Sequence, residues 1–176
     1  MSARRRPGAA VLLAALAVLA AGCGDGGKVE GTADSAPAAP APSAVAADRA
    51  LTYMRAVVAD DWSTACSLMS PAHRAACHDR HTAPPEPETD GPAISPVILD
   101  RAPTQATATA AHPAGWAVIA AYTVTWPGKP PTTSRVALRM TQDSGTWWVE
   151  QREDVADSDL TWSDDPARSA LTRETG

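Results

Sequence analysis

The sequence predicts an α+β fold in which N-terminal helices pack on a curved antiparallel β-sheet. Between residues 44 and 78 the apolar residues recur at helical spacing, whereas after Pro96 the apolar pattern changes to a period of two. The joints between the alternating segments are short and rich in Gly and Pro, which is typical of an antiparallel meander. A sheet with one apolar face must bury that face under other elements, and the helices serve this purpose.

Residues 1–22 have the features of an export signal. Three arginines, Arg4 to Arg6, precede an apolar run from Ala9 to Ala21, which is shorter than the about 20 residues that a membrane-spanning helix needs. Small side chains directly before Cys23 suit a signal peptidase, so we expect cleavage before this cysteine. The alternative is an ordinary secretory signal in which Cys23 is incidental.

The residues up to Cys23 resemble the lipobox of the bacterial lipoproteins, in which a branched apolar residue and two small residues precede the cysteine that receives the lipid. Ala20 stands where that pattern prefers leucine, and Leu19 lies one place further out. The resemblance implies a diacylglyceryl thioether on Cys23. It therefore also implies an extracytoplasmic protein that lipid anchors to the outer face of the cell membrane.

Residues 23–43 are expected to form the lipidated cysteine and a disordered tether, because they are rich in Gly, Ala and Pro and offer almost nothing to bury. Coil statistics give this tether a reach of roughly 25 Å. The segment 1–22 carries three arginines and no acidic residue, so its removal changes the formal net charge from −5 to −8. This charge makes nucleic acid and anionic lipid headgroups poor partners.

Three helices are predicted in succession. Ser43 is the expected N-cap of a first helix of about four turns, and Asp61 is the expected N-cap of a second helix over residues 62–69. Ser70 and Pro71 repeat this device for a third helix that runs to about residue 78, because the first helical position does not need the N–H that proline lacks. Residues 82–96 are rich in proline and acidic residues and predict no regular structure.

Four strands are predicted after this connector: residues 97–101 together with 105–111 as one bent strand, 116–126, 135–141 and 146–153. Alternation along the last strand places Trp147 and Val149 on one face. The opposite face then carries Trp148, Glu150 and Arg152.

The order of these elements, the turn "ADDWSTACSLMSP" and the last strand "SGTWWVE" resemble the NTF2-like (nuclear transport factor 2-like) superfamily. The resemblance covers roughly residues 45–155, and we assign the domain to residues 44–155. It implies a cone-shaped α+β domain that often forms a dimer through its sheet. Enzymes, binding proteins and accessory domains share this fold, so the fold alone does not choose among them.

Two further cysteines, Cys66 and Cys77, lie on neighbouring predicted helices and are expected to form a disulfide outside the reducing cytoplasm. Closing this short loop would contribute roughly 3 kcal/mol to stability. A zinc site that adds His73, His78 and His81 is the alternative, but the spacing fits no standard finger or ribbon. We therefore predict no metal and no other cofactor.

The sequence contains no recognisable catalytic constellation, such as a Ser/His/Asp grouping or a glycine-rich phosphate loop. The polar residues on the predicted strands include Asp100, Arg101, Tyr122, Arg139 and Glu150. Of these, Tyr122, Asp100 and Arg139 are the expected lining of a cavity in the cone. His112 lies in a turn beside Pro113 and offers no strand position.

The sequence also predicts where three side chains, Arg135, Arg139 and Trp148, and the C-terminal segment lie. Arg135 and Arg139 share one face of their strand and are expected to form a solvated row rather than an oxyanion clamp. Trp148 is expected to face away from the helices, as part of a dimer or partner surface, or else to pack under the C-terminal segment with Trp162. Residues 156–176 are expected to be an acidic, solvated tail with a short helix after Asp165.

Together these features predict a membrane-anchored extracytoplasmic lipoprotein with a non-catalytic binding or accessory role at the cell envelope. Its expected partners are the membrane, through Cys23, an envelope protein of unknown identity, and a second copy of the chain. The alternative is a small-molecule-binding protein or an enzyme that uses the cavity of the cone. An open cavity beside a titratable group with a perturbed pKa would favour that alternative.

Overall fold

The computed structural model describes residues 39–82 and 91–173, all within one compact unit, Ala38–Gly176. The expected signal, Cys23 and most of the tether lie outside the described residues. No helix in the described ranges is long and apolar enough to cross a membrane. The elements are α1 (Pro42–Val58), α2 (Trp62–Ser67), α3 (Pro71–Arg80), β1 (Ala93–Ile94), β2 (Ile98–Leu99), β3 (Thr104–Ala106), β4 (Gly115–Thr125), β5 (Thr132–Asp143), β6 (Thr146–Asp154), α4 (Asp157–Trp162) and α5 (Pro166–Thr172).

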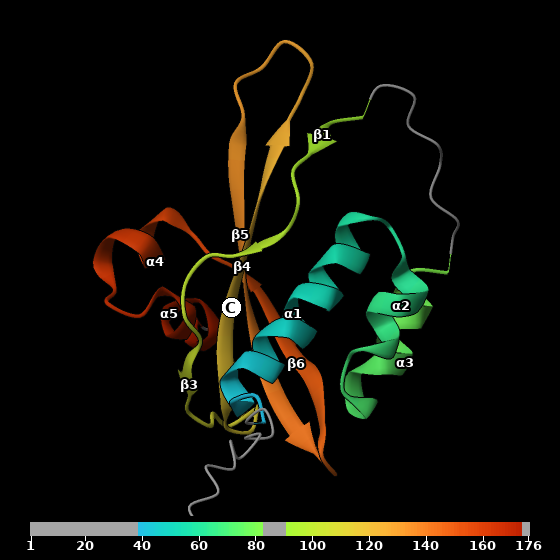
Figure 1. The fold of residues 1–176 in the computed structure, drawn as a ribbon, viewed down its shortest axis with the longest axis vertical. Helices are drawn as coiled ribbons and strands as arrows, with labels where there is room; N and C mark the ends of the chain where they lie inside the picture. Colours follow the sequence, from blue (N-terminus) through green and yellow to red (C-terminus); the bar gives the residue numbers. More distant parts are fainter. Residues whose placement is uncertain (1–38, 83–90, 174–176) are drawn as a thin grey trace, which may run out of the picture. The chain divides into compact units, whose positions relative to one another are not determined.

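The predicted α+β class and antiparallel meander are confirmed, since β4, β5 and β6 pair in sequence order in a curled sheet (Figure 1). The short strands β1, β2 and β3 pair one after another with β4. Of the predicted bent strand, residues 97–101 and 105–111, only β2 and β3 form, and residues 107–111 are a loop. Our prediction of no regular structure in residues 82–96 was wrong at β1, which pairs with Val124 and Thr125. The Ser144–Gly145 turn joins β5 to β6, with positive φ at both residues, as in the turns that suit two-residue hairpins.

One face of the sheet is covered by α1, as predicted. The helix packs across β4, β5 and β6, and its buried residues include Ala46, Ala50, Tyr53 and Met54. They meet Val118, Val136, Leu138, Met140 and Val149 from the strands.

The helix α1 begins with Pro42 and is preceded by Ala41 as N-cap, so the prediction of Ser43 as N-cap was wrong. The predicted cap at Asp61 is confirmed, because its carboxylate accepts a hydrogen bond from Thr64 N at 3.0 Å.

The opposite face is covered by the C-terminal segment, which we had expected to be a solvated tail. The predicted short helix, α5, exists and is capped by Asp165, which accepts from Arg168 N at 3.1 Å. However, α5 buries its apolar residues in a second core with Ala106, Ala117, Ile119 and Ala137 of the strands. Small side chains let the short helix approach the sheet closely. The chain itself thus covers part of the face through which a dimer was expected.

A bulge in β6 changes which side chains share a face. Val149 pairs with Met140, whereas Gln151 pairs with Arg139, so Glu150 is an extra residue between two paired positions. Beyond the bulge Arg152 pairs with Leu138, whose side chain lies in the α1-covered core. The simple alternation that placed Arg152 on the opposite face from Val149 was therefore wrong.

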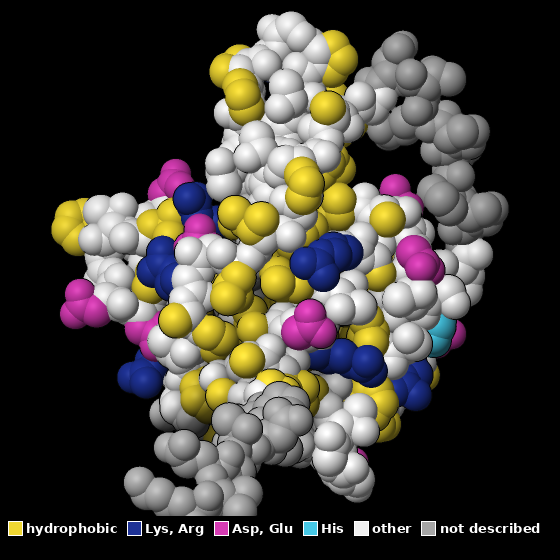
Figure 2. Space-filling view, in the orientation of Figure 1, with side chains coloured by type: hydrophobic (Ala, Val, Ile, Leu, Met, Phe, Trp, Pro, Cys, Tyr) yellow, Lys and Arg dark blue, Asp and Glu magenta, His cyan; other side chains and the backbone are white. Residues whose placement is uncertain are grey.

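The edge of the sheet at β1 and β2 and the projecting β4–β5 hairpin expose apolar side chains. Ile98 is 59% exposed, and Trp126, just after β4, is 47% exposed. Figure 2 shows several separate hydrophobic side chains on this otherwise mostly white hairpin, and the charged side chains visible in the same view lie lower.

Candidate functional site

The candidate site is a pocket of about 500 Å³ between the α2–α3 pair and the edge strand β6. Its lining combines aromatic, imidazole and charged side chains. The lining residues are Tyr53, Trp62, Met69, His73, Ala76, Cys77, Arg80, His81, His112, Glu150, Gln151, Arg152 and Glu153.

Covalent and backbone contacts fix α3 against the sheet. Cys66 and Cys77 are joined in a disulfide with their Cα atoms 5.5 Å apart, so the predicted staple between α2 and α3 is confirmed. The segment between these helices runs alongside β6: Val149 N donates to Leu68 O at 3.0 Å, and Ser70 N donates to Val149 O at 2.9 Å. These bonds place the first turn of α3 opposite Glu150.

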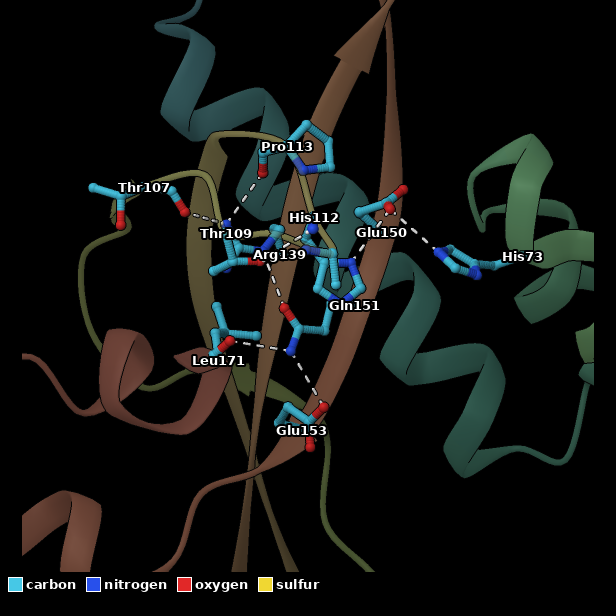
Figure 3. Close-up of polar contacts among 11 residues, drawn as sticks. His73, Thr107, Thr109, His112, Pro113, Arg139, Glu150, Gln151, Glu153 and Leu171 are labelled. Atoms are coloured by element: carbon cyan, nitrogen blue, oxygen red, sulfur yellow. Dashed lines mark hydrogen bonds and ion pairs between the residues drawn. The ribbon is translucent and has the colours of Figure 1, made fainter. Parts of the chain in front are cut away.

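Glu150 is the centre of a cluster of three titratable side chains. His73 Nε2 lies 3.2 Å from Glu150 Oε1, and His112 Nδ1 lies 3.4 Å from the same oxygen (Figure 3). The bulge explains the position of Glu150, because an unpaired residue in a bulge can direct its side chain away from the regular alternation. Each of the three residues comes from a different segment, since α3 carries His73, the β3–β4 loop carries His112 and β6 carries Glu150.

The His112 loop is held by its own turn and by Arg139. Thr109 Oγ1 accepts from His112 N at 3.1 Å, and Thr109 N donates to His112 O at 2.8 Å. Arg139 donates from one nitrogen to Thr107 O at 2.7 Å and to Pro113 O at 3.1 Å, the two carbonyls that flank this turn. The loop that carries His112 is therefore tied to the middle of β5.

Arg139 is 1% exposed, so the prediction of a solvated row with Arg135 was wrong. Its Nε donates to Gln151 Oε1 at 3.0 Å, and the Gln151 amide donates to Leu171 O at 3.1 Å and to Glu153 Oε1 at 3.3 Å (Figure 3). Burial lowers the pKa of Arg139, and the charge of Glu150 opposes this lowering. Alternation placed Arg139 correctly on the face opposite Leu138, but α5 and the β3–β4 loop close over that face.

Hydrogen bonding sets the protonation of Glu150. Burial alone would raise the pKa of this carboxyl, but the nearby Ser70 hydroxyl and the hydrogen bonds with His112 and His73 outweigh burial and lower the pKa. The Ser70 hydroxyl is buried and forms no hydrogen bond of ordinary geometry with the part of the chain that the structure describes. Glu150 is therefore ionised at neutral pH.

The rest of the pocket carries aromatic groups and charges of both signs. Trp62 and His81 stack with ring centroids 3.5 Å apart and ring planes 4° from parallel. Burial raises the pKa of the Tyr53 hydroxyl, and the charges of Arg152 and Arg80 oppose this rise.

The residues that we expected to line a cavity lie elsewhere. Asp100 pairs with Arg101 at 3.1 Å and with Arg135 at 3.0 Å, Tyr122 packs against the α1-covered core, and Arg139 is enclosed on the opposite face. None of the three lines the pocket. The alternative zinc site is also not assembled as considered, because the disulfide consumes both cysteines and His81 stacks on Trp62.

Trp148 lies beside the helices rather than away from them. The guanidinium groups of Arg49 in α1 and Arg74 in α3 lie 5.8 Å and 5.0 Å from the centre of its indole ring. Trp162 is 85% exposed, so it does not pack over Trp148. A role of Trp148 in a partner surface stays a prediction.

The cluster of His73, His112 and Glu150 was not predicted from the sequence, although each residue had been noted separately. His112 and His73 lie 38 and 77 positions from Glu150, so no local motif links them. The one local signal was a carboxylate inside the otherwise aromatic and apolar stretch that begins β6. Comparison of the chain with protein-family models, curated proteins and solved structures gave no match.

Proposed function

We propose that this protein is a lipid-anchored extracytoplasmic binding protein whose pocket takes a small polar ligand. The observation that carries the proposal is the pocket of about 500 Å³ in which Glu150 meets His73 and His112. A concave site with a few convergent polar groups is the usual form of a small-molecule site. The anchor rests on the resemblance of the first 23 residues to bacterial lipoproteins, and the NTF2-like assignment rests on the resemblance of residues 45–155 to that superfamily.

The walls of the pocket support binding because they are held rigidly. The disulfide fixes α2 to α3, and backbone hydrogen bonds fix the segment between them to β6. Rigid walls lower the entropy cost of binding, because fewer protein groups have to become ordered around the ligand. The lining offers cations at Arg80 and Arg152, carboxylates at Glu150 and Glu153, and a flat aromatic surface at Trp62. Such a lining suits a polar molecule that carries both donors and acceptors.

Catalysis in the same pocket is the second candidate function. An ionised carboxylate between two imidazoles is able to hold and pass a proton, which is the requirement for general acid–base chemistry. A bound molecule whose mass changes on the unaltered protein, but not on the Glu150→Gln variant, would favour catalysis over binding.

Filling the pocket tests the binding proposal. Ala76 lines the pocket, whereas Ala75 is exposed on the same helix and does not, so Ala75→Trp is the matched control for Ala76→Trp. The full chain is purified from an exporting host, incubated with a protein-free small-molecule extract of that host and measured by native mass spectrometry. We expect an adduct on the unaltered protein and on the control, and none on Ala76→Trp. An equal adduct on Ala76→Trp, or none on any of the three, contradicts the proposal.

Replacing the expected lipid acceptor tests the anchor. We expect the unaltered chain in the membrane fraction with the added mass of a lipid on Cys23, and we expect Cys23→Ser to lose both. Cys66→Ser removes a different cysteine and should keep the lipid. Processing and membrane retention of Cys23→Ser would refute lipidation at this position.

A further inference from the structure

We propose that His73, His112 and Glu150 form a binding site for a divalent transition-metal ion, for which Zn²⁺ is the probe. The ligand atoms are His73 Nε2, His112 Nδ1 and a carboxylate oxygen of Glu150. The inference rests on the proposed function in one respect, since the metal would lie in the wall of the proposed ligand pocket.

The spacing of the three ligand atoms fits a metal ion. Zinc ligands at ~2.0–2.1 Å in tetrahedral geometry lie about 3.3–3.4 Å from each other. The two distances to Glu150 Oε1 are 3.2 Å from His73 and 3.4 Å from His112, and all three ligand atoms lie within 4.8 Å of one another. The third pair of ligand atoms is His73 Nε2 and His112 Nδ1. The His73 side chain is 40% exposed, so its ring is free to rotate slightly and bring these two atoms closer together.

The ligand set indicates an ion with an open coordination position. Two imidazoles and one carboxylate are the protein ligands of several catalytic zinc sites, in which water or substrate takes the fourth position. The same set with open positions also suits other first-row metals that prefer nitrogen and oxygen ligands. Here His73, His112 and Glu150 all line the same pocket, which provides the space for an exchangeable fourth ligand.

A second observation points to the same place. Ser70 is buried, with 6% of the residue exposed, and its hydroxyl has no hydrogen-bond partner among the described residues. Its backbone N–H donates to the carbonyl of Val149, the residue before Glu150. A buried donor of this kind is suited to hold the carboxylate oxygen that faces away from a metal, as groups behind metal ligands commonly do. Arg139 supports His112 in a similar way, because it donates hydrogen bonds to the carbonyls of Thr107 and Pro113, which flank the turn that carries His112.

The two cations in the lining of the pocket oppose the ion only weakly. Arg80 and Arg152 line the same pocket, but both residues are exposed, and solvent screens their repulsion of a bound cation. They are also placed to attract an anionic group of a ligand that completes the coordination of the metal.

Titration with Zn²⁺ tests the site on the full chain with its disulfide intact. The chain is stripped with EDTA, exchanged into chelator-free buffer and titrated by calorimetry. We expect one Zn²⁺ per chain, and at least about a tenfold loss of affinity in each of His73→Gln, His112→Gln and Glu150→Gln. His78→Gln is the matched control, because His78 is exposed on the same helix as His73, and its affinity should not change. The visible spectrum of the Co²⁺ form gives an independent reading of the ligands.

Three results would overturn the metal site: no saturable Zn²⁺ binding, unchanged affinity in Glu150→Gln, or an equal loss in the His78→Gln control. The thermal melt of each variant separates loss of a ligand from loss of the fold. An adduct in the pocket experiment that persists with EDTA, without any Zn²⁺ binding, overturns the metal site and leaves the proposed function intact. Zn²⁺ binding without any adduct supports the metal site and contradicts the proposed small-molecule function.

Discussion

Glu150 and Gln151 are neighbouring residues of β6 that belong to two different polar clusters. The clusters differ in whether their hydrogen-bonding groups are all bonded within the protein. Arg139 and Gln151 bind each other, three backbone carbonyls and Glu153 under α5 and the β3–β4 loop. Glu150, the next residue along, faces two imidazoles at the wall of a pocket. A polar group whose bonds are all internal stabilises the fold, whereas one that keeps free capacity beside a pocket is available to a ligand.

The bulge at Glu150 separates these two roles. In a regular ladder without the bulge, Glu150 would pair with Arg139, and the pairing of Gln151 with Arg139 would be lost. The comparison therefore leads us to expect that variants of the Arg139 cluster mainly change stability. Variants of the Glu150 cluster should mainly change binding.

Arg139→Met is expected to have the largest effect on stability. It keeps the volume of the side chain but leaves Gln151 Oε1 and two loop carbonyls without their charged donor, which should cost about 3 kcal/mol. Arg135→Met is the matched control on the same strand, because the pair of Arg135 with Asp100 is partly exposed and should contribute less than about 1 kcal/mol. Urea unfolding of both variants measures the difference, and equal losses would contradict a structural role that is specific to Arg139.

Removal of the disulfide, by Cys66→Ser with Cys77→Ser, is expected to cost roughly 2–3 kcal/mol through the larger entropy of the unfolded chain. It should also weaken Zn²⁺ binding, because α3 carries both Cys77 and His73. Arg139→Met should weaken Zn²⁺ binding less, since it changes only the support of the His112 loop. Urea unfolding and calorimetry on the same samples test both statements, and unchanged Zn²⁺ affinity in the double variant would show that the disulfide does not position His73.

Glu150→Gln is expected to cost about 1 kcal/mol at pH 7 in the presence of EDTA. Burial raises the pKa of Glu150, but the nearby Ser70 hydroxyl and the hydrogen bonds with His112 and His73 lower it overall, so the ionised form stabilises the fold. This contribution is present above the ordinary glutamate value of 4.5 and is lost as the pH falls through the lower pKa of the folded state. Unfolding free energies of both proteins between pH 7 and pH 3 should therefore converge, and a constant difference would contradict this explanation.

His112→Gln is expected to change the stability of the metal-free protein least, by no more than about 0.5 kcal/mol, because its side chain is partly exposed and makes one long contact with Glu150. The same variant should lose Zn²⁺ binding. This combination would distinguish the Glu150 cluster most clearly from the Arg139 cluster. A loss of several kcal/mol would instead make His112 part of the structural network.

The sequence predicted the elements whose signals are local. Helical spacing, the cap at Asp61 and the Ser70–Pro71 pair located α2 and α3 to within a few residues, and alternation located β4, β5 and β6. The cysteine pair was also predictable, because the two residues lie only 11 positions apart on adjacent helices.

The features that the sequence did not predict depend on long-range packing. The short helix α5 was predicted, but its burial on the sheet was not, because it has only seven residues and buries mainly alanine and one leucine, so its apolar side gives little signal against an acidic background. The bulge at Glu150 is invisible in a pattern of period two, and it decides where Glu150 and Arg152 point. The site depends on this bulge and on two histidines from distant segments, and for that reason alternation selected Tyr122, Asp100 and Arg139 instead.

Crystallising the protein with Zn²⁺ and measuring anomalous diffraction at the zinc edge would test directly whether Glu150, His73 and His112 form a metal site at the pocket wall. We expect one strong peak at about 2.0–2.2 Å from His73 Nε2, His112 Nδ1 and a Glu150 oxygen. A map without a peak between these three side chains, or with zinc bound only at exposed positions such as His78, would contradict it.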